Sequence, residues 1–266
     1  MNIDIDNYLK RIKYHKTLTC DRRTLRGIHR AQRFNIPFDM LDFHLKIAPN
    51  LDPDYIYKKL VMTQRGGGCS QLNELLALVL IELGYKVERL LARVPADTAP
   101  GKTPQLSHKI LRVSFDNESW LCDVGFGGNC LIEPIPFVEN EENMQSSGIF
   151  SLLQDDTWGY KLHCLRGKET KTVYTFHTTE YYPEDFNAIN FYNTFSRKVG
   201  FCRHAIVTLP THNGRKSLKD RVLYKTEKGK LIQEVAIKNA RDYHKILEKE
   251  FNIILPNHSD FFPNKS

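Results

Sequence analysis

The sequence predicts an α+β fold with helices first and a barrel-like β-sheet after them. Residues 4–62 and the run that ends at Gly84 carry apolar residues mainly at helical spacing. From Tyr85 the apolar period changes to two, as in strands, and Ile237–Phe251 returns to helical spacing. A chain of 266 residues can bury a substantial core and is expected to form one to three compact units.

Before the first strand we expect several short helices. The predicted segments are Tyr8–Ile12, Thr19–Gln32 and Asp54–Met62. Thr19 or Asp21 can cap the second helix, and Pro37 prevents it from continuing. Pro53 suits the first turn of the third helix.

A glycine loop then places a cysteine at the start of a long apolar helix. Gly66–Gly68 precede Cys69, and Gly84 ends the helix that follows. Glycines allow positive φ and close approach of a ligand, and a helix N-terminus favours a thiolate. Cys69 is therefore either an activated nucleophile or a buried structural cysteine.

The remainder of the chain is mostly strand. We expect strands at Val87–Val94, Lys109–Phe115, Ser119–Val124, 150–153, 160–164, 172–177, 205–209 and 221–225, and a short helix at 182–190. Asp116–Glu118 is a turn signal, so the second and third strands form a hairpin. The loop from Pro95 to Pro104 ends just before His108. Asn213-Gly214 is a further turn signal.

Composition excludes several classes of function. Lys and Arg exceed Asp and Glu by 38 − 31 = 7, which suits a polyanionic partner such as coenzyme A or RNA. The basic residues form no run of five and no recognisable nucleic-acid module, so we expect no nucleic acid. The six cysteines show no C-x-x-C and no zinc spacing, which predicts free thiols and no metal site. The polar start and the shortness of the longest apolar run, Leu75–Ile81, predict a soluble, cytoplasmic protein with no membrane segment.

Cys69, His108 and Asp123 are the residue types that thiol acyl transfer requires. The histidine holds the thiol proton, and the carboxylate orients the histidine. The predicted hairpin returns His108 and Asp123 to the same end of the sheet, which makes their contact natural. Taken alone, Asp123 could instead cap a turn.

Here the chain resembles the arylamine N-acetyltransferase family. The glycine loop reads Arg65-Gly-Gly-Gly-Cys69-Ser-Gln-Leu-Asn73, and His108 is followed by Asp123-Val-Gly-Phe-Gly127, as in that family's two signatures. N-terminal stretches agree as well. The resemblance implies a helical bundle (1–83) carrying the nucleophile, a central β-barrel (84–192) carrying His108 and Asp123, and a C-terminal α/β lid (193–266). It also implies a catalytic core like that of cysteine proteases and transglutaminases.

The resemblance further implies a ping-pong reaction through a Cys69 thioester, with acetyl-CoA as acyl donor and no metal. The acceptor would be a small aromatic amine, an arylhydroxylamine or a hydrazine. Phe38, Val94 and Phe126 match pocket positions of the family, although core packing also explains Phe38 and Val94. Pro104, Gln105 and Tyr192 match positions that bind coenzyme A in the family. Arg197-Lys198 departs from the family pattern, and this basic pair either contacts the phosphates of coenzyme A or is a solvated surface pair.

Gly68 replaces a common aromatic of the family, which we expect to widen the approach to Cys69. Two alternatives keep the Cys–His–Asp residues, namely an amide synthase and a transglutaminase-like hydrolase. A third, a nucleic-acid-binding protein, makes Cys69 structural. The sequence does not fix the oligomeric state.

Overall fold

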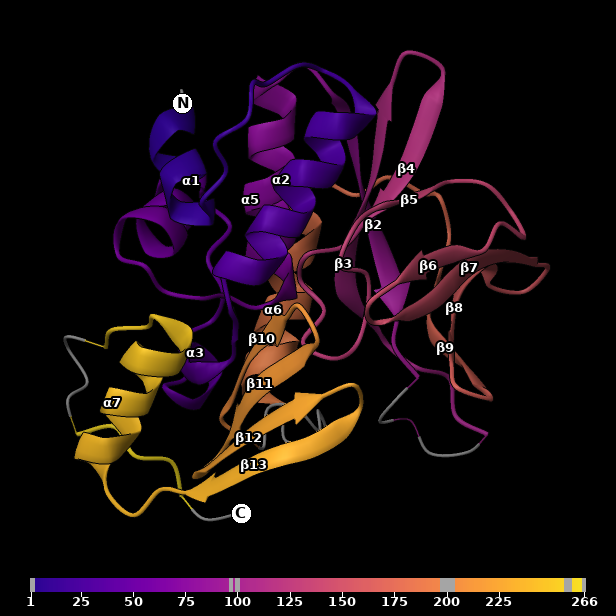
Figure 1. Ribbon diagram of the computed structural model, residues 1–266. Helices are drawn as coiled ribbons and strands as arrows, with labels where there is room; N and C mark the ends of the chain where they lie inside the picture. The colour runs from indigo at the N-terminus through magenta and orange to yellow at the C-terminus, as the bar shows by residue number, and fades with distance from the viewer. Residues whose placement is uncertain (1–2, 96–97, 99–100, 197–203, 256–259, 265–266) are drawn as a thin grey trace.

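The computed structural model describes residues 3–95, 98, 101–196, 204–255 and 260–264. Within them the fold is α+β, as predicted. N-terminal helices pack beside an eight-stranded antiparallel sheet that curls into a nearly closed barrel, and a five-stranded sheet with one helix follows (Figure 1).

The side chains of Asp4, Asp21 and Asp52 cap three of the N-terminal helices. The helices of this region are α1 (Ile5–Ile12), α2 (Arg22–Asn35), α3 (Leu41–His44), α4 (Pro53–Tyr57), the π-helical turn η1 (Lys58–Met62) and α5 (Cys69–Glu82). Asp21, one of the two predicted caps, accepts a hydrogen bond from the backbone N–H of Thr24. The predicted helix 54–62 is divided between α4 and η1, and the short α3 was not predicted. Gly84 adopts φ +90° directly after α5.

The barrel sheet has the order β5-β4-β3-β2-β9-β8-β7-β6. Its strands are β2 (Lys86–Arg93), β3 (Leu106–Phe115), β4 (Glu118–Cys122), β5 (Ile135–Pro136), β6 (Asn143–Gln145), β7 (Gly148–Asp155), β8 (Gly159–Arg166) and β9 (Glu169–Phe176). The predicted hairpin is present as β3–β4, with Leu111 opposite Cys122. On β2, Ala92 lies opposite His108.

The side chains of β2 and β3 alternate between two apolar clusters, as the period of two predicts. Leu91 and Leu111 pack with helices α1, α2 and α5, whereas Leu90 and Ile110 face the barrel interior. The strands are therefore buried on both faces, which fixes their register because a one-residue slip would exchange the faces.

The second sheet joins distant parts of the chain. Its order is β1-β10-β11-β12-β13, from β1 (Phe38–Asp39), β10 (Ile206–Thr211), β11 (Gly214–Lys219), β12 (Val222–Glu227) and β13 (Lys230–Ala236). Phe38 pairs with Thr208 and also bridges to Gly67 in the glycine loop. The division of the chain into regions 1–83, 84–192 and 193–266 stays a proposal. Strand β1, from the first region, pairs with β10 of the third.

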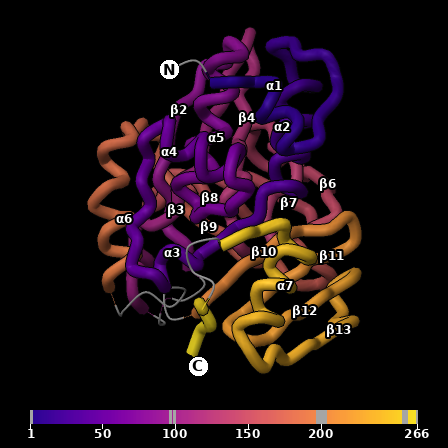
Figure 2. The backbone as a smooth tube through the Cα atoms, turned by 90° about the vertical axis from the view of Figure 1, so that its left-hand side faces the viewer, coloured from indigo at the N-terminus to yellow at the C-terminus, as the bar shows by residue number. Residues whose placement is uncertain are grey.

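Two helices complete the fold, and both differ in extent from the prediction. The predicted helix 182–190 is a 3-10 turn, η2 (Pro183–Asp185), followed by α6 (Phe186–Phe195). The last helix, α7 (Ala240–Phe251), begins later than predicted because Asn239 caps it. In Figure 2, α6 and α7 lie on opposite sides of the view, and α7 packs beside β10–β13.

Candidate active site

The glycine loop places Cys69 at the first position of α5. None of Gly66–Gly68 adopts the positive φ that glycine allows. Close approach instead explains Gly66, where an added Cβ would lie 2.4 Å from the carbonyl oxygen of Pro37. An added Cβ at Gly68 would lie 3.3 Å from the ring of Phe43, so a buried aromatic already occupies the space beside Gly68.

His108 and Asp123 meet at one end of the β3–β4 hairpin, as predicted. The Nε2 atom of His108 lies 2.8 Å from Oδ2 of Asp123. Both side chains are buried, with 6% and 0% of their surface exposed. Because Asp123 occupies Nε2, the other ring nitrogen of His108 remains for Cys69.

The carboxylate of Asp123 is held by several donors. Its Oδ1 accepts hydrogen bonds from Asn73 Nδ2 at 3.1 Å and from the backbone N–H of Gly125 at 2.9 Å. The Cys130 thiol donates to Oδ2 at 3.7 Å. Burial alone would raise the pKa of Asp123, but the charge and hydrogen bond of His108 and the Asn73 amide lower it. Asp123 is therefore a carboxylate at neutral pH.

Cys69 and His108 change each other's titration. Burial opposes ionisation of the Cys69 thiol, yet the hydrogen bond and charge of His108 outweigh it and lower the pKa of Cys69. Burial disfavours the imidazolium as well, but Asp123 and Cys69 raise the pKa of His108 to about 10. Both shifts favour the thiolate–imidazolium form of the pair, the state that makes a cysteine nucleophilic.

Behind the carboxylate lies a neutral histidine that sequence analysis missed. The backbone N–H of Asp123 donates to His29 Nε2 at 3.0 Å, so the other nitrogen, Nδ1, donates to the carbonyl of Ile132. Burial lowers the pKa of His29 to about 4, which agrees with this uncharged tautomer. Its only sequence signal is a histidine on the apolar face of α2.

A buried arginine and a partly buried one hold the segment after β4, and sequence analysis missed them too. Arg33 donates to the carbonyl of Phe126 at 2.6 Å and to that of Gly128 at 3.2 Å. Arg215, from β11, donates to the carbonyl of Gly127 at 2.8 Å and also to Gly128. The segment that carries Phe126 is therefore fixed from both α2 and the second sheet.

The three predicted acceptor-pocket residues are partly buried, and one of them contacts the triad. The Phe126 ring meets the His108 ring edge-on, with centroids 5.2 Å apart. Phe38 packs its ring against Gly127, where an added Cβ would lie 2.6 Å from it. Val94 directly follows β2 and packs against the same cluster as Phe126. The structure brings Phe38 and Phe126 together around Gly127.

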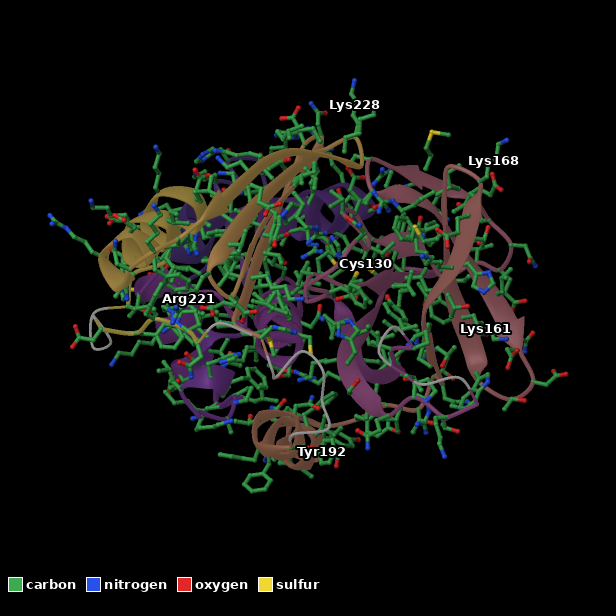
Figure 3. The ribbon with its side chains drawn as sticks, turned by 90° about the horizontal axis from the view of Figure 1, so that it is seen from below. Cys130, Lys161, Lys168, Tyr192, Arg221 and Lys228 are labelled. Atoms are coloured by element: carbon green, nitrogen blue, oxygen red, sulfur yellow. The ribbon has the colours of Figure 1, made fainter. Side chains whose placement is uncertain are left out.

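Two of the three predicted coenzyme A residues are in contact. Gln105 Nε2 donates to the Tyr192 hydroxyl at 3.3 Å, and Figure 3 shows Tyr192 on α6. The backbone carbonyl of Pro104 accepts from Arg93 at 2.7 Å. Two residues beyond Gln105, the carbonyl of Ser107 accepts from the Cys69 thiol at 3.8 Å. Arg197 and Lys198 lie outside the described residues.

Metal-ligand clusters, disulfides and membrane-spanning helices are absent from the described residues. In that part of the chain no three His, Cys, Asp or Glu side chains are grouped so as to hold a metal ion. Cys20, Cys69, Cys122, Cys130 and Cys164 are free. None of the described helices is long and apolar enough to cross a bilayer.

Together, the fold and the site define a Cys–His–Asp enzyme of the acyl-transferase class. The family model described as N-acetyltransferase matches residues 21–260. An arylamine N-acetyltransferase of Escherichia coli (strain K12) is 28% identical over 94% of this chain and 88% of its own length. The chain belongs to the arylamine N-acetyltransferase family.

Solved structures agree with this assignment. The arylamine N-acetyltransferase of Salmonella typhimurium matches with a TM-score of 0.89 at 25% identity, covering 95% of this chain and 92% of the other. The Mycobacterium marinum enzyme in complex with CoA matches with a TM-score of 0.86 at 27% identity, covering 94% and 93%.

Proposed function

We propose that this enzyme transfers an acetyl group from acetyl-CoA, through a thioester on Cys69, to the amine of small aromatic amines, arylhydroxylamines or hydrazines. The observation that carries the proposal is the buried 2.8 Å contact between His108 and Asp123 beside Cys69. Membership of the arylamine N-acetyltransferase family supports the donor and the class of acceptor.

In the first half-reaction the Cys69 thiolate attacks the carbonyl carbon of the acetyl thioester. The bond from that carbon to the coenzyme A sulfur breaks, and the imidazolium of His108 supplies the proton that leaves with coenzyme A. Asp123 remains ionised throughout and keeps His108 oriented. The products are acetyl-Cys69 and neutral His108.

In the second half-reaction the amine nitrogen attacks acetyl-Cys69. Neutral His108 takes the proton that the nitrogen loses, the carbon–sulfur bond to Cys69 breaks, and the thiolate–imidazolium pair returns. An aromatic amine is largely unprotonated at neutral pH, so its main need is a flat apolar pocket. Phe38, Val94 and Phe126 are our proposed pocket residues.

The coenzyme A assignment is a proposal for Pro104, Gln105 and Tyr192. Gln105 and Tyr192 share a hydrogen bond, and the chain from Gln105 continues to Ser107, whose carbonyl contacts the Cys69 thiol. The similar Mycobacterium marinum enzyme was solved with CoA. We also propose a cytoplasmic location, which suits the buried free thiols Cys122, Cys130 and Cys164.

Intact-mass measurement after mixing with acetyl-CoA alone tests the proposal. Wild type should gain one acetyl group, Cys69→Ala should gain none, and an added arylamine should discharge the adduct as its acetamide. Release of acetate without any amine would instead favour the hydrolase. Turnover retained in Cys69→Ala would overturn the mechanism.

A further inference from the structure

A buried ion pair joins the helix of the nucleophile to the strand of the histidine. Lys109 Nζ lies 2.7 Å from Glu74 Oε2, with 0% and 2% of the two side chains exposed. Arg89 also binds Glu74, through Nε at 2.8 Å and Nη2 at 2.6 Å. Glu74 directly follows Asn73, and Lys109 directly follows His108.

The backbone of Lys109 touches the triad at two points. Its carbonyl accepts a hydrogen bond from Asn73 Nδ2 at 2.6 Å, and the same amide nitrogen holds Asp123. Burial raises the pKa of the Cys69 thiol, and the backbone N–H of Lys109 is, after His108, among the groups that lower it. A displacement of Lys109 would therefore move a donor away from the nucleophile.

The side chain of Lys109 reaches a third element. Its ammonium nitrogen lies 3.9 Å from the ring centroid of Phe186, the first residue of α6. The same helix carries Tyr192, one of the proposed coenzyme A residues. The Lys109 ammonium thus contacts both the α5 carboxylate and α6, and its own backbone lies on β3.

Energetics favour positioning over stability as the role of this cluster. Desolvation offsets most of the Coulombic attraction of a buried ion pair, so such a pair adds little net stability, whereas loss of one partner leaves a buried charge. Hydrogen-bonded buried pairs restrict geometry, because each charge tolerates few alternative positions. Glu74 has two cationic partners, and the face of Phe186 suits the remaining positive charge.

We propose that Lys109 is a positioning residue that, through Glu74 and Phe186, fixes its own backbone N–H against Cys69 and α5 against β3. This inference rests on the proposed role of Cys69 as the nucleophile. The titration of Cys69 is affected by the ring of His108, the carboxylate of Asp123 and the backbone N–H of Lys109. The ammonium of Lys109 also interacts with the charge of Cys69, and the carbonyl of Ser107 accepts from the thiol at 3.8 Å.

Lys109→Met is the test variant, because it leaves Glu74 paired with Arg89. Arg112→Met is the matched control, since Arg112 lies on the same strand and pairs with Glu88 on β2 at 2.7 Å without contacting α5. The measurements are the rate of Cys69 alkylation against pH, kcat and KM, and the melting temperature.

We expect Lys109→Met to lower kcat on the order of tenfold, with less effect on KM, and to move the alkylation profile to higher pH. Arg112→Met should leave both unchanged. An unchanged profile and kcat in folded Lys109→Met, or an equal change in Arg112→Met, would overturn the inference. If Lys109→Met does not fold, Lys109→Leu, which also removes the donor to Glu74, carries the same comparison and the same criterion.

Failure of the proposed function would be visible separately. If the wild-type enzyme forms no acetyl adduct, the proposed role of Cys69 as the nucleophile is wrong. If wild type forms the adduct and Lys109→Met keeps the wild-type alkylation profile and kcat, only the positioning role of Lys109 is wrong.

Discussion

Two histidine–aspartate pairs of nearly equal length occur in different parts of this molecule. In the barrel, His108 lies 2.8 Å from Asp123, and in the second sheet His204 lies 2.7 Å from Asp220. The barrel pair is 6% and 0% exposed, whereas the other is 29% and 11% exposed. The two pairs therefore have nearly the same His–Asp distance but differ in how far they are buried.

The partners of the two pairs differ as well. Asp220 Oδ1 accepts from the backbone N–H of Ala205, which anchors the turn between β11 and β12 to β10. Asp123 is instead held by Asn73, and its histidine is hydrogen-bonded to Cys69. A His–Asp contact becomes chemically active here because it is desolvated and a thiol lies next to it.

The largest expected effect comes from the two histidines. His108→Gln should lower kcat/KM roughly 10⁴-fold, because the thiolate loses its counter-ion and the reaction loses its proton carrier. His204→Gln is the matched change in the less buried pair. Its kcat/KM should remain within about twofold of wild type, as is usual for polar substitutions away from the active site. Steady-state acetylation of an arylamine measures both. Equal losses in the two variants would erase the proposed distinction.

The two aspartates should differ next. Asp123→Asn should lower kcat roughly 10²- to 10³-fold and slow Cys69 alkylation near neutral pH, because a neutral amide no longer stabilises the imidazolium. Asp220→Asn should leave the alkylation profile unchanged. Alkylation rates across pH measure this, and an unaltered profile in Asp123→Asn would remove Asp123 from the triad.

His29, the other buried histidine of the described residues, should affect stability rather than chemistry. Its pKa is about 4 when folded and 6.5 in its reference state. The unfolded chain therefore binds more protons between these values, and the free energy of unfolding should fall by roughly 3 kcal/mol as pH drops through that window.

The matched pair of variants for this effect is His29→Gln and His15→Gln, the latter at an exposed site. Urea unfolding at pH values across the window should show a flatter dependence for His29→Gln. His15→Gln should keep the wild-type slope. A wild-type slope in both would show that His29 does not carry the effect.

The parts of the site that sequence predicts are those encoded locally. Cys69 follows a glycine loop at a helix start, and the β3–β4 hairpin brings His108 to Asp123 across a short turn. The period of two also predicted six of the eight barrel strands, because each face packs against its own core, but it missed the short β5 and β6.

What sequence does not predict depends on long-range pairing. Arg215 reaches Gly127 from β11, and β1 is only two residues long, so neither has a local pattern. The exposed strand β13 lacks the half-buried alternation that identifies strands. At Gly68, the family resemblance predicted a wider approach to Cys69, and it did not reveal that the ring of Phe43 from α3 lies beside this glycine, 3.3 Å from an added Cβ.

Thiolate absorbance in the ultraviolet tests the central claim most directly. The difference between wild type and Cys69→Ala should show a thiolate that forms well below the ordinary cysteine pKa of about 8.5. That low-pH thiolate should vanish in His108→Gln and persist in His204→Gln. A thiolate that forms only near pH ~8.5 in wild type, or one that survives in His108→Gln, would contradict the account.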